Sequence, residues 1–199
     1  MCRLVCVTAK QLCKIDFCKR INEISKTKVD KIILREKYLS EEDYYTLAQN
    51  LLTACEAEKL VIHSFVDVAI KLGVRKIHLP FEQFKNYKNT MDFDVVGTSV
   101  HSVEDAVYAE THGADYIVAG HIFETDCKKG LTGRGVDFLR SICDSVKIPV
   151  YAVGGINTKT ACQLKNIKNK NFAGVCVMSE LMQSESVAEN VEKILNELR

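Results

Sequence analysis

The sequence predicts a (β/α)8 barrel, and three observations favour that fold class. Short apolar runs alternate with helical stretches from one end of the chain to the other. The runs are almost continuously apolar, which is typical of parallel strands covered on both faces. Eight strand–helix units fit the 199 residues at roughly 25 residues each, which is compact for this barrel but feasible. A doubly wound open sheet is the structural alternative, and it would need fewer strands and a topological switch point.

Each expected strand is a short run of mostly apolar residues. We expect strands at Leu4–Thr8, Lys31–Leu34, Leu60–His63, Lys76–Leu79, Val95–Val100, Tyr116–Ala119, Val150–Val153 and Gly174–Met178. No low-complexity or linker-like stretch separates them. Residues 1–199 are therefore expected to form one domain.

Two helices carry a recognisable start signal. Ser40 and Ser102 each precede a helical stretch, and each has an aspartate three residues later, as in a variant of the capping box. Gly113 ends the second of these helices. The final helix is expected to open at Ser179 and to bury one apolar face. The remaining crossovers are assigned to helices at Cys18–Lys28, Val66–Leu72, Phe81–Tyr87, Val136–Ser145 and Lys159–Leu164.

Composition excludes several classes of protein. The formal net charge is +1 and the sequence pI is about 7.5, so no electrostatic reason exists to expect nucleic-acid or membrane binding. No signal peptide or membrane span is readable. The nine cysteines are an odd number without a C-x-x-C pair, which suits a reducing cytoplasm better than a disulfide framework.

Four of the five histidines stand at the ends of four successive strands, where active sites of such barrels lie: His63, His78, His101 and His121. Taken singly, each has a structural explanation as a polar plug that bonds a neighbouring backbone group. A metal site is another alternative, although no His-x-His pair and no carboxylate at a strand end supports it. The fifth, His112, ends a helix and is expected to be structural.

A phosphate site is indicated by the loops after the last two strands. Gly154 and Gly155 end one apolar strand, and glycines there let backbone N–H groups approach an anion. Met178 and Ser179 end the next strand, and these two loops are the usual phosphate site of such barrels. The alternative is that the glycines only make a tight turn. The polar loop Phe123–Gly130 is either a lid or anion clasp, or a solvated surface loop.

Several segments resemble the thiamine phosphate synthase/TenI family. They are ILREKYLSEEDYYTLA, VDVAIKLGVRKIHLP, GTSVHSVEDAVYAETHGADYIVAGHIFETDCKKGL, IPVYAVGGIN and GVCVMSELM, and they run from about Asp30 to Met182. The resemblance implies a barrel that handles a phosphorylated thiazole. It also implies that Arg35 and Lys37 are the family's basic pair.

The family has two branches, and two regions of the sequence distinguish them. Thiamine phosphate synthases hold magnesium with an aspartate after the third strand and another after the fourth. Here Ser64 stands in the first place, and Pro80 to Gln83 replace the segment with the second, where Glu82 compensates only in part. After the sixth strand, His121 resembles the TenI branch, the thiazole tautomerases.

The resemblance therefore implies an isomerase that aromatises a carboxythiazole phosphate, with His121 as the acid/base and no cofactor or metal. Gly155 and Ser179 would hold the phosphate, Thr125 and Cys127 would lie near the carboxylate, and Lys128 would balance charge. The full set of expected substrate-binding residues is Arg35, Lys37, His63, Thr98, His101, Thr125, Cys127, Lys128, Gly154, Gly155, Met178 and Ser179.

Two alternatives stay open. One is a thiamine phosphate synthase that joins a hydroxymethylpyrimidine pyrophosphate to the thiazole phosphate, in which case Mg²⁺ would be the cofactor. The other is a non-catalytic phosphate-binding or regulatory protein, because a fold alone does not establish an activity. The expected partner is the phosphorylated thiazole, with no nucleic acid and no membrane, and a homodimer is carried over from the family. The expected location is the cytoplasm.

Overall fold

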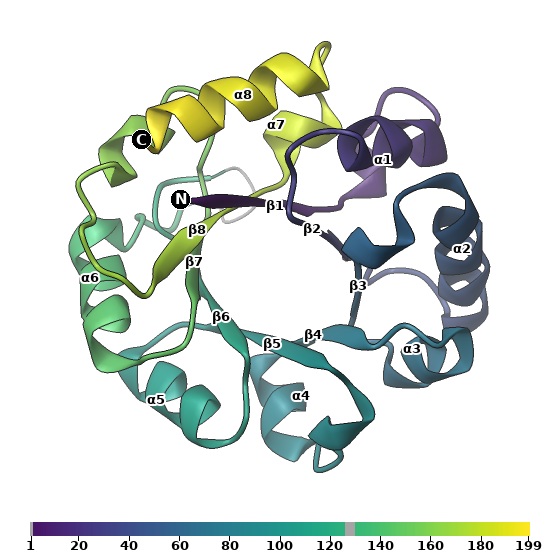
Figure 1. Cartoon of the computed structure of the whole chain (residues 1–199), viewed down its shortest axis with the longest axis horizontal. Coiled ribbons are helices and arrows are strands. Elements are labelled where there is room, and N and C mark those ends of the chain that lie inside the picture. Colours follow the sequence, from purple (N-terminus) through teal and green to yellow (C-terminus); the bar gives the residue numbers. More distant parts are fainter. Residues whose placement is uncertain (1, 126–129) are drawn as a thin grey trace.

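The computed structural model describes residues 2–125 and 130–199, and its eight parallel strands close into one barrel in sequence order, β1 to β8 (Figure 1). The strands are β1 (Arg3–Val7), β2 (Lys31–Leu34), β3 (Leu60–His63), β4 (Lys76–Pro80), β5 (Val95–Val100), β6 (Tyr116–Gly120), β7 (Val150–Val153) and β8 (Phe172–Val177). β8 pairs with β1 and closes the ring. The predicted (β/α)8 barrel is therefore confirmed, and the open-sheet alternative is excluded.

The helices form the outer ring in Figure 1. They are α1 (Phe17–Ser25), α2 (Glu41–Ala54), α3 (Val66–Leu72), α4 (Phe81–Asn86), α5 (Val103–Thr111), α6 (Gly135–Ser145), α7 (Ser179–Met182) and α8 (Val187–Glu197). Among the described residues no helix is long and apolar enough to cross a membrane.

The two predicted start signals are confirmed. The hydroxyl oxygen of Ser40 accepts from the N–H of Asp43 at 3.1 Å, and that of Ser102 accepts from the N–H of Asp105 at 3.0 Å. Each side chain satisfies an amide that has no partner inside its own helix. The sequence signal therefore located the first residues of α2 and α5 correctly.

Two helix predictions were wrong. Residues 159–164 contain only a 3-10 turn at Ala161–Leu164. The Asn157 carboxamide oxygen accepts from the N–H groups of Lys159 and Thr160, and this local turn competes with a helical start. Ser179 opens the four-residue α7, and the final helix α8 begins later, at Val187.

Strand side chains divide into two apolar cores because successive residues point to opposite faces. One core lies between strands and helices and includes Ile62, Ile77 and Ile117. The other fills the barrel interior and consists of Val5, Val7, Ile33, Val61, Tyr116, Val118, Tyr151 and Cys176.

Gly97 on β5 makes room for Tyr116, one of the two interior tyrosines. A Cβ atom on Gly97 would lie 2.0 Å from Cζ of Tyr116. Glycine in a strand often marks such a close approach. The Tyr116 ring therefore lies over Gly97 on the neighbouring strand, inside the barrel.

Candidate active site

A buried polar network lies inside the barrel and joins His78 of β4 to Ser99 of β5 and to Tyr116, the first residue of β6. The two ring nitrogens of His78 bond hydroxyls on neighbouring strands: Nε2 lies 2.9 Å from Oγ of Ser99, and Nδ1 lies 3.1 Å from the hydroxyl of Tyr116. His78 is only 3% exposed. Since both nitrogens have partners, the ring is held in one orientation.

His63 on β3 lies beside this network. Its ring stacks on that of His78 with centroids 5.7 Å apart, and its Nδ1 lies 2.6 Å from Oγ of Ser64. Burial lowers the pKa of His63 to about 2, and the neighbouring His78, Lys37 and Arg35 add to the effect. Burial also lowers the pKa of His78 to about 3. Both imidazoles are therefore neutral at physiological pH.

Arg35 and Lys37, which follow β2, bring positive charge to the same end of the barrel. Neither side chain forms an ion pair with any residue in the described ranges. Glu36, which stands between them, faces elsewhere: its buried carboxylate accepts from Thr8 at 2.6 Å and from the Lys10 N–H at 3.0 Å. Partial desolvation and the Arg35 guanidinium lower the pKa of Lys37. Two neighbouring cations without an ion-pair partner among the described residues can attract an anion.

His121 follows β6 and is buried, with 7% of its surface exposed. Its Nε2 donates to the carbonyl of Thr132 at 3.0 Å, and its own carbonyl accepts from the N–H of Arg134 at 3.0 Å. Because a carbonyl can only accept, Nε2 of His121 carries a proton. These bonds join the two ends of the loop between β6 and α6.

Gly154 and Gly155 follow β7 in left-handed backbone conformations, with φ of 106° and 64°. A Cβ on Gly154 would lie 2.6 Å from Cβ of His121, and one on Gly155 would lie 2.3 Å from the carbonyl oxygen of Glu124. The glycines thus let the β6 loop pack on the β7 loop. Neither of their N–H groups donates to a residue that the structure describes, so both are available to an anion.

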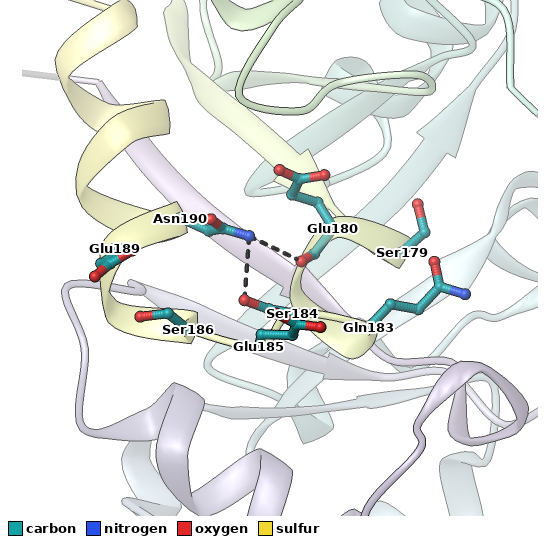
Figure 2. Close-up of a pocket in the computed structure, with 8 residues that line it drawn as sticks. All are labelled: Ser179, Glu180, Gln183, Ser184, Glu185, Ser186, Glu189 and Asn190. Atoms are coloured by element: carbon teal, nitrogen blue, oxygen red, sulfur yellow. Dashed lines mark hydrogen bonds between the residues drawn. The ribbon is translucent and has the colours of Figure 1, made fainter.

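Met178 and Ser179 complete the predicted phosphate loops at the end of β8. Met178 packs against both apolar cores, while Ser179 is exposed at the start of α7. A pocket of about 470 Å³ lies beside it, between α7 and α8 (Figure 2). It is lined by Ser179, Glu180, Gln183, Ser184, Glu185, Ser186, Glu189 and Asn190. Its three glutamates would repel a phosphate, so this pocket is unsuited to the predicted anion.

The remaining predicted substrate-binding residues that the structure describes lie outside the network of His63 and His78. Thr98 is fully buried, and its hydroxyl donates to the Leu79 carbonyl at 2.9 Å, so Ser99 and not Thr98 has the inward position on β5. His101 is exposed and donates from Nδ1 to the Gly120 carbonyl at 3.2 Å. Thr125 is half-buried in the β6 loop. Cys127 and Lys128 lie outside the described residues.

Sequence reasoning missed Ser99 and Tyr116 and did not assign a role to Ser64. The alternation of side chains along β5 could have identified Ser99, because Gly97 and Ser99 share one face. The contact between Tyr116 and His78 has no sequence signal, since 38 residues separate them.

Comparison with known proteins gives a consistent result. The family described as thiamine monophosphate synthase matches residues 4–181. The thiamine-phosphate synthase of Fusobacterium nucleatum is 33% identical over 202 residues, covering 98% of this chain and 96% of that protein. That of Clostridium tetani is 29% identical, covering 97% and 94%. The solved thiamine phosphate pyrophosphorylase from Pyrococcus furiosus superposes with a TM-score of 0.80 at 28% identity, covering 98% and 95%.

These relatives correct the predicted activity. All three are named for the synthase reaction, which is a transfer and not an isomerisation. The prediction of a thiazole tautomerase, which depended on the histidine after the sixth strand, is therefore wrong. The findings favour the synthase alternative instead. With a match over nearly its whole length, the chain belongs to the thiamine monophosphate synthase family.

Proposed function

We propose that the chain is a thiamine-phosphate synthase, a transferase that joins a hydroxymethylpyrimidine pyrophosphate to a thiazole phosphate. The observation that carries the proposal is the 33% identity to a synthase over 98% of this chain. An anion site at each side of the barrel mouth is in keeping with it, because both substrates carry phosphate.

The two expected anion sites lie at the same end of the barrel but on different strands. Arg35 and Lys37 follow β2, whereas Gly154 and Gly155 follow β7. In the ring of eight strands β2 and β7 are separated by β1 and β8. We assign the pyrophosphate to the cationic side and the thiazole phosphate to the free N–H groups of the glycines. The reacting ends of the two substrates then meet over the neutral network of His63 and His78.

The reaction needs charge stabilisation where the leaving group departs. A ring nitrogen of the thiazole forms a bond to the pyrimidine methylene carbon, the bond from that carbon to oxygen breaks, and pyrophosphate leaves with both electrons. Negative charge grows on the departing oxygen. Arg35 and Lys37 would stabilise that charge, because neither has a carboxylate partner among the described residues.

The family resemblance implies magnesium, but the residues after β3 and β4 do not fit it. They offer the hydroxyl of Ser64 and the imidazoles of His63 and His78, whereas Mg²⁺ is held by carboxylate oxygens. Glu82 is 77% exposed and pairs with Lys85 at 2.8 Å. No cluster of three His, Cys, Asp or Glu side chains suited to a metal occurs in residues 2–125 and 130–199.

Product formation tests the proposal. The purified chain is supplied with both substrates, with and without magnesium, and thiamine phosphate is measured by chromatography. Arg35→Ala should lower kcat/KM at least ~10-fold, the scale of one lost charge-assisted hydrogen bond. Arg75→Ala is the matched control, since Arg75 pairs with Asp94 at the other end of β4. Substrate binding without product under either condition would refute the proposal and favour the non-catalytic alternative.

A further inference from the structure

We infer that this chain binds the pyrophosphate group of its substrate through Arg35, Lys37 and His63, with no divalent cation at the ends of β3 and β4. The inference rests on the proposed function for the identity of the substrate. It concerns a separate property, which is how the negative charge of pyrophosphate is balanced.

The charge balance of the site favours binding of pyrophosphate without a metal. A magnesium site in this place would contain carboxylates, and these would offset much of the charge of a bound ion. In the part of the chain that the structure describes, no carboxylate pairs with Arg35 or Lys37. The only acid between them, Glu36, is bound to Thr8 and to the Lys10 amide. The site thus presents two positive charges directly to an anion.

The hydrogen-bonding capacity of His63 suits a phosphate oxygen better than a magnesium ion. When the Ser64 hydroxyl donates to Nδ1, the ring proton lies on Nε2. Nε2 bonds no described residue, and it is not one of the buried atoms without a partner, so it reaches solvent. A neutral imidazole N–H is a donor to phosphate oxygen. It cannot serve as a hard anionic ligand for Mg²⁺.

Ser64 provides a sharp test because its backbone already suits an aspartate. Its φ is 69°, and it is the one non-glycine residue with positive φ in the described ranges. Asp and Asn adopt this conformation more readily than other side chains. Ser64→Asp would therefore add one carboxylate without new backbone strain. Ser64→Asn is the matched control, with the same shape and no charge.

The experiment is calorimetric titration of the full chain with inorganic pyrophosphate, in EDTA and in magnesium chloride. For the wild type we expect binding in EDTA that magnesium does not strengthen. Arg35→Ala should weaken binding in EDTA at least ~10-fold, and Arg75→Ala should not change it. Ser64→Asp should weaken binding in EDTA and gain affinity when magnesium is added. Ser64→Asn should gain none.

The outcomes separate the inference from the proposed function. Pyrophosphate binding by the wild type only in the presence of magnesium would overturn the inference, whether or not thiamine phosphate is formed. Binding in EDTA without formation of thiamine phosphate under any condition would refute the proposed function and leave the inference standing. Thiamine phosphate formed at equal rates in EDTA and in magnesium would support both.

Discussion

Acid should destabilise this protein through the two buried imidazoles, His63 and His78. The pKa of each is lowered in the fold, to about 2 and about 3, chiefly by burial. In the unfolded chain a histidine has a pKa of about 6.5. The neutral rings therefore contribute stability that is complete above pH ~6.5, and this stability is lost as the pH falls toward the folded-state values.

The size of the effect follows from proton linkage. Below pH ~6.5 each histidine removes about 1.4 kcal/mol of unfolding free energy per pH unit, so the pair removes about 2.7 kcal/mol per unit. From pH 7.5 to 4.5 the loss is about 5 kcal/mol, which is comparable with the whole stability of many domains. Carboxylates add to acid unfolding in the same range, so a comparison of variants is needed.

Urea unfolding followed by circular dichroism at half-unit steps of pH measures this slope. His78→Gln should remove about half of the histidine contribution, and the double variant with His63→Gln should remove all of it. The slopes can be compared even if the variants are less stable at neutral pH. A double variant with the same pH slope as the wild type would refute the reasoning. So would ring proton signals that titrate near pH 6.5 in the folded protein.

Three further predictions concern packing and the loops. Gly97→Ala should cost about 1–3 kcal/mol or more in urea unfolding, because its Cβ would lie 2.0 Å from the Tyr116 ring; a change below ~0.5 kcal/mol would contradict the packing described. Gly155→Ala should raise KM for the thiazole phosphate and leave KM for the pyrimidine substrate unchanged, since φ of 64° and the β6 loop oppose a side chain there; equal rises in both would contradict the assignment. His121→Ala should speed amide exchange in residues 131–135, because its bond to Thr132 is lost; unchanged exchange would show that the bond does not hold the loop.

The sequence predicted the barrel well because each strand is a separate apolar run between polar segments. Six of the eight predicted strands differ from the structure by no more than one residue at a single end, or not at all: β2, β3, β4, β5, β6 and β7. The failures lie where local hydrogen bonds decide the backbone. The turn at Asn157 replaced a helical start, and the short α7 ends at Met182, before α8 begins at Val187.

The candidate site was only partly predictable. Strand ends indicate which residues reach the mouth, and His63, His78, Arg35 and Lys37 are indeed brought together there. Whether a side chain of a strand points into or out of the barrel depends on the strand register, which the strand ends alone do not give. For this reason Thr98 was predicted in place of Ser99. A motif histidine does not fix an activity either, because one residue type at one position can bind, plug or transfer protons.

The low basicity of the two imidazoles matters for the proposed synthase, which would bind two anions. Charged imidazoles in the centre of the mouth would attract both phosphates to the same place, and the two substrates would then repel each other. Burial keeps His63 and His78 neutral, so the attractive groups remain at the two sides: Arg35 and Lys37 at one, and the backbone N–H groups of the β7 loop at the other. The neutral imidazoles of His63 and His78, which lie between these groups, could still form hydrogen bonds with the uncharged rings of the two proposed substrates. In the proposed synthase, the burial that makes the protein sensitive to acid would thus also keep the two phosphates apart.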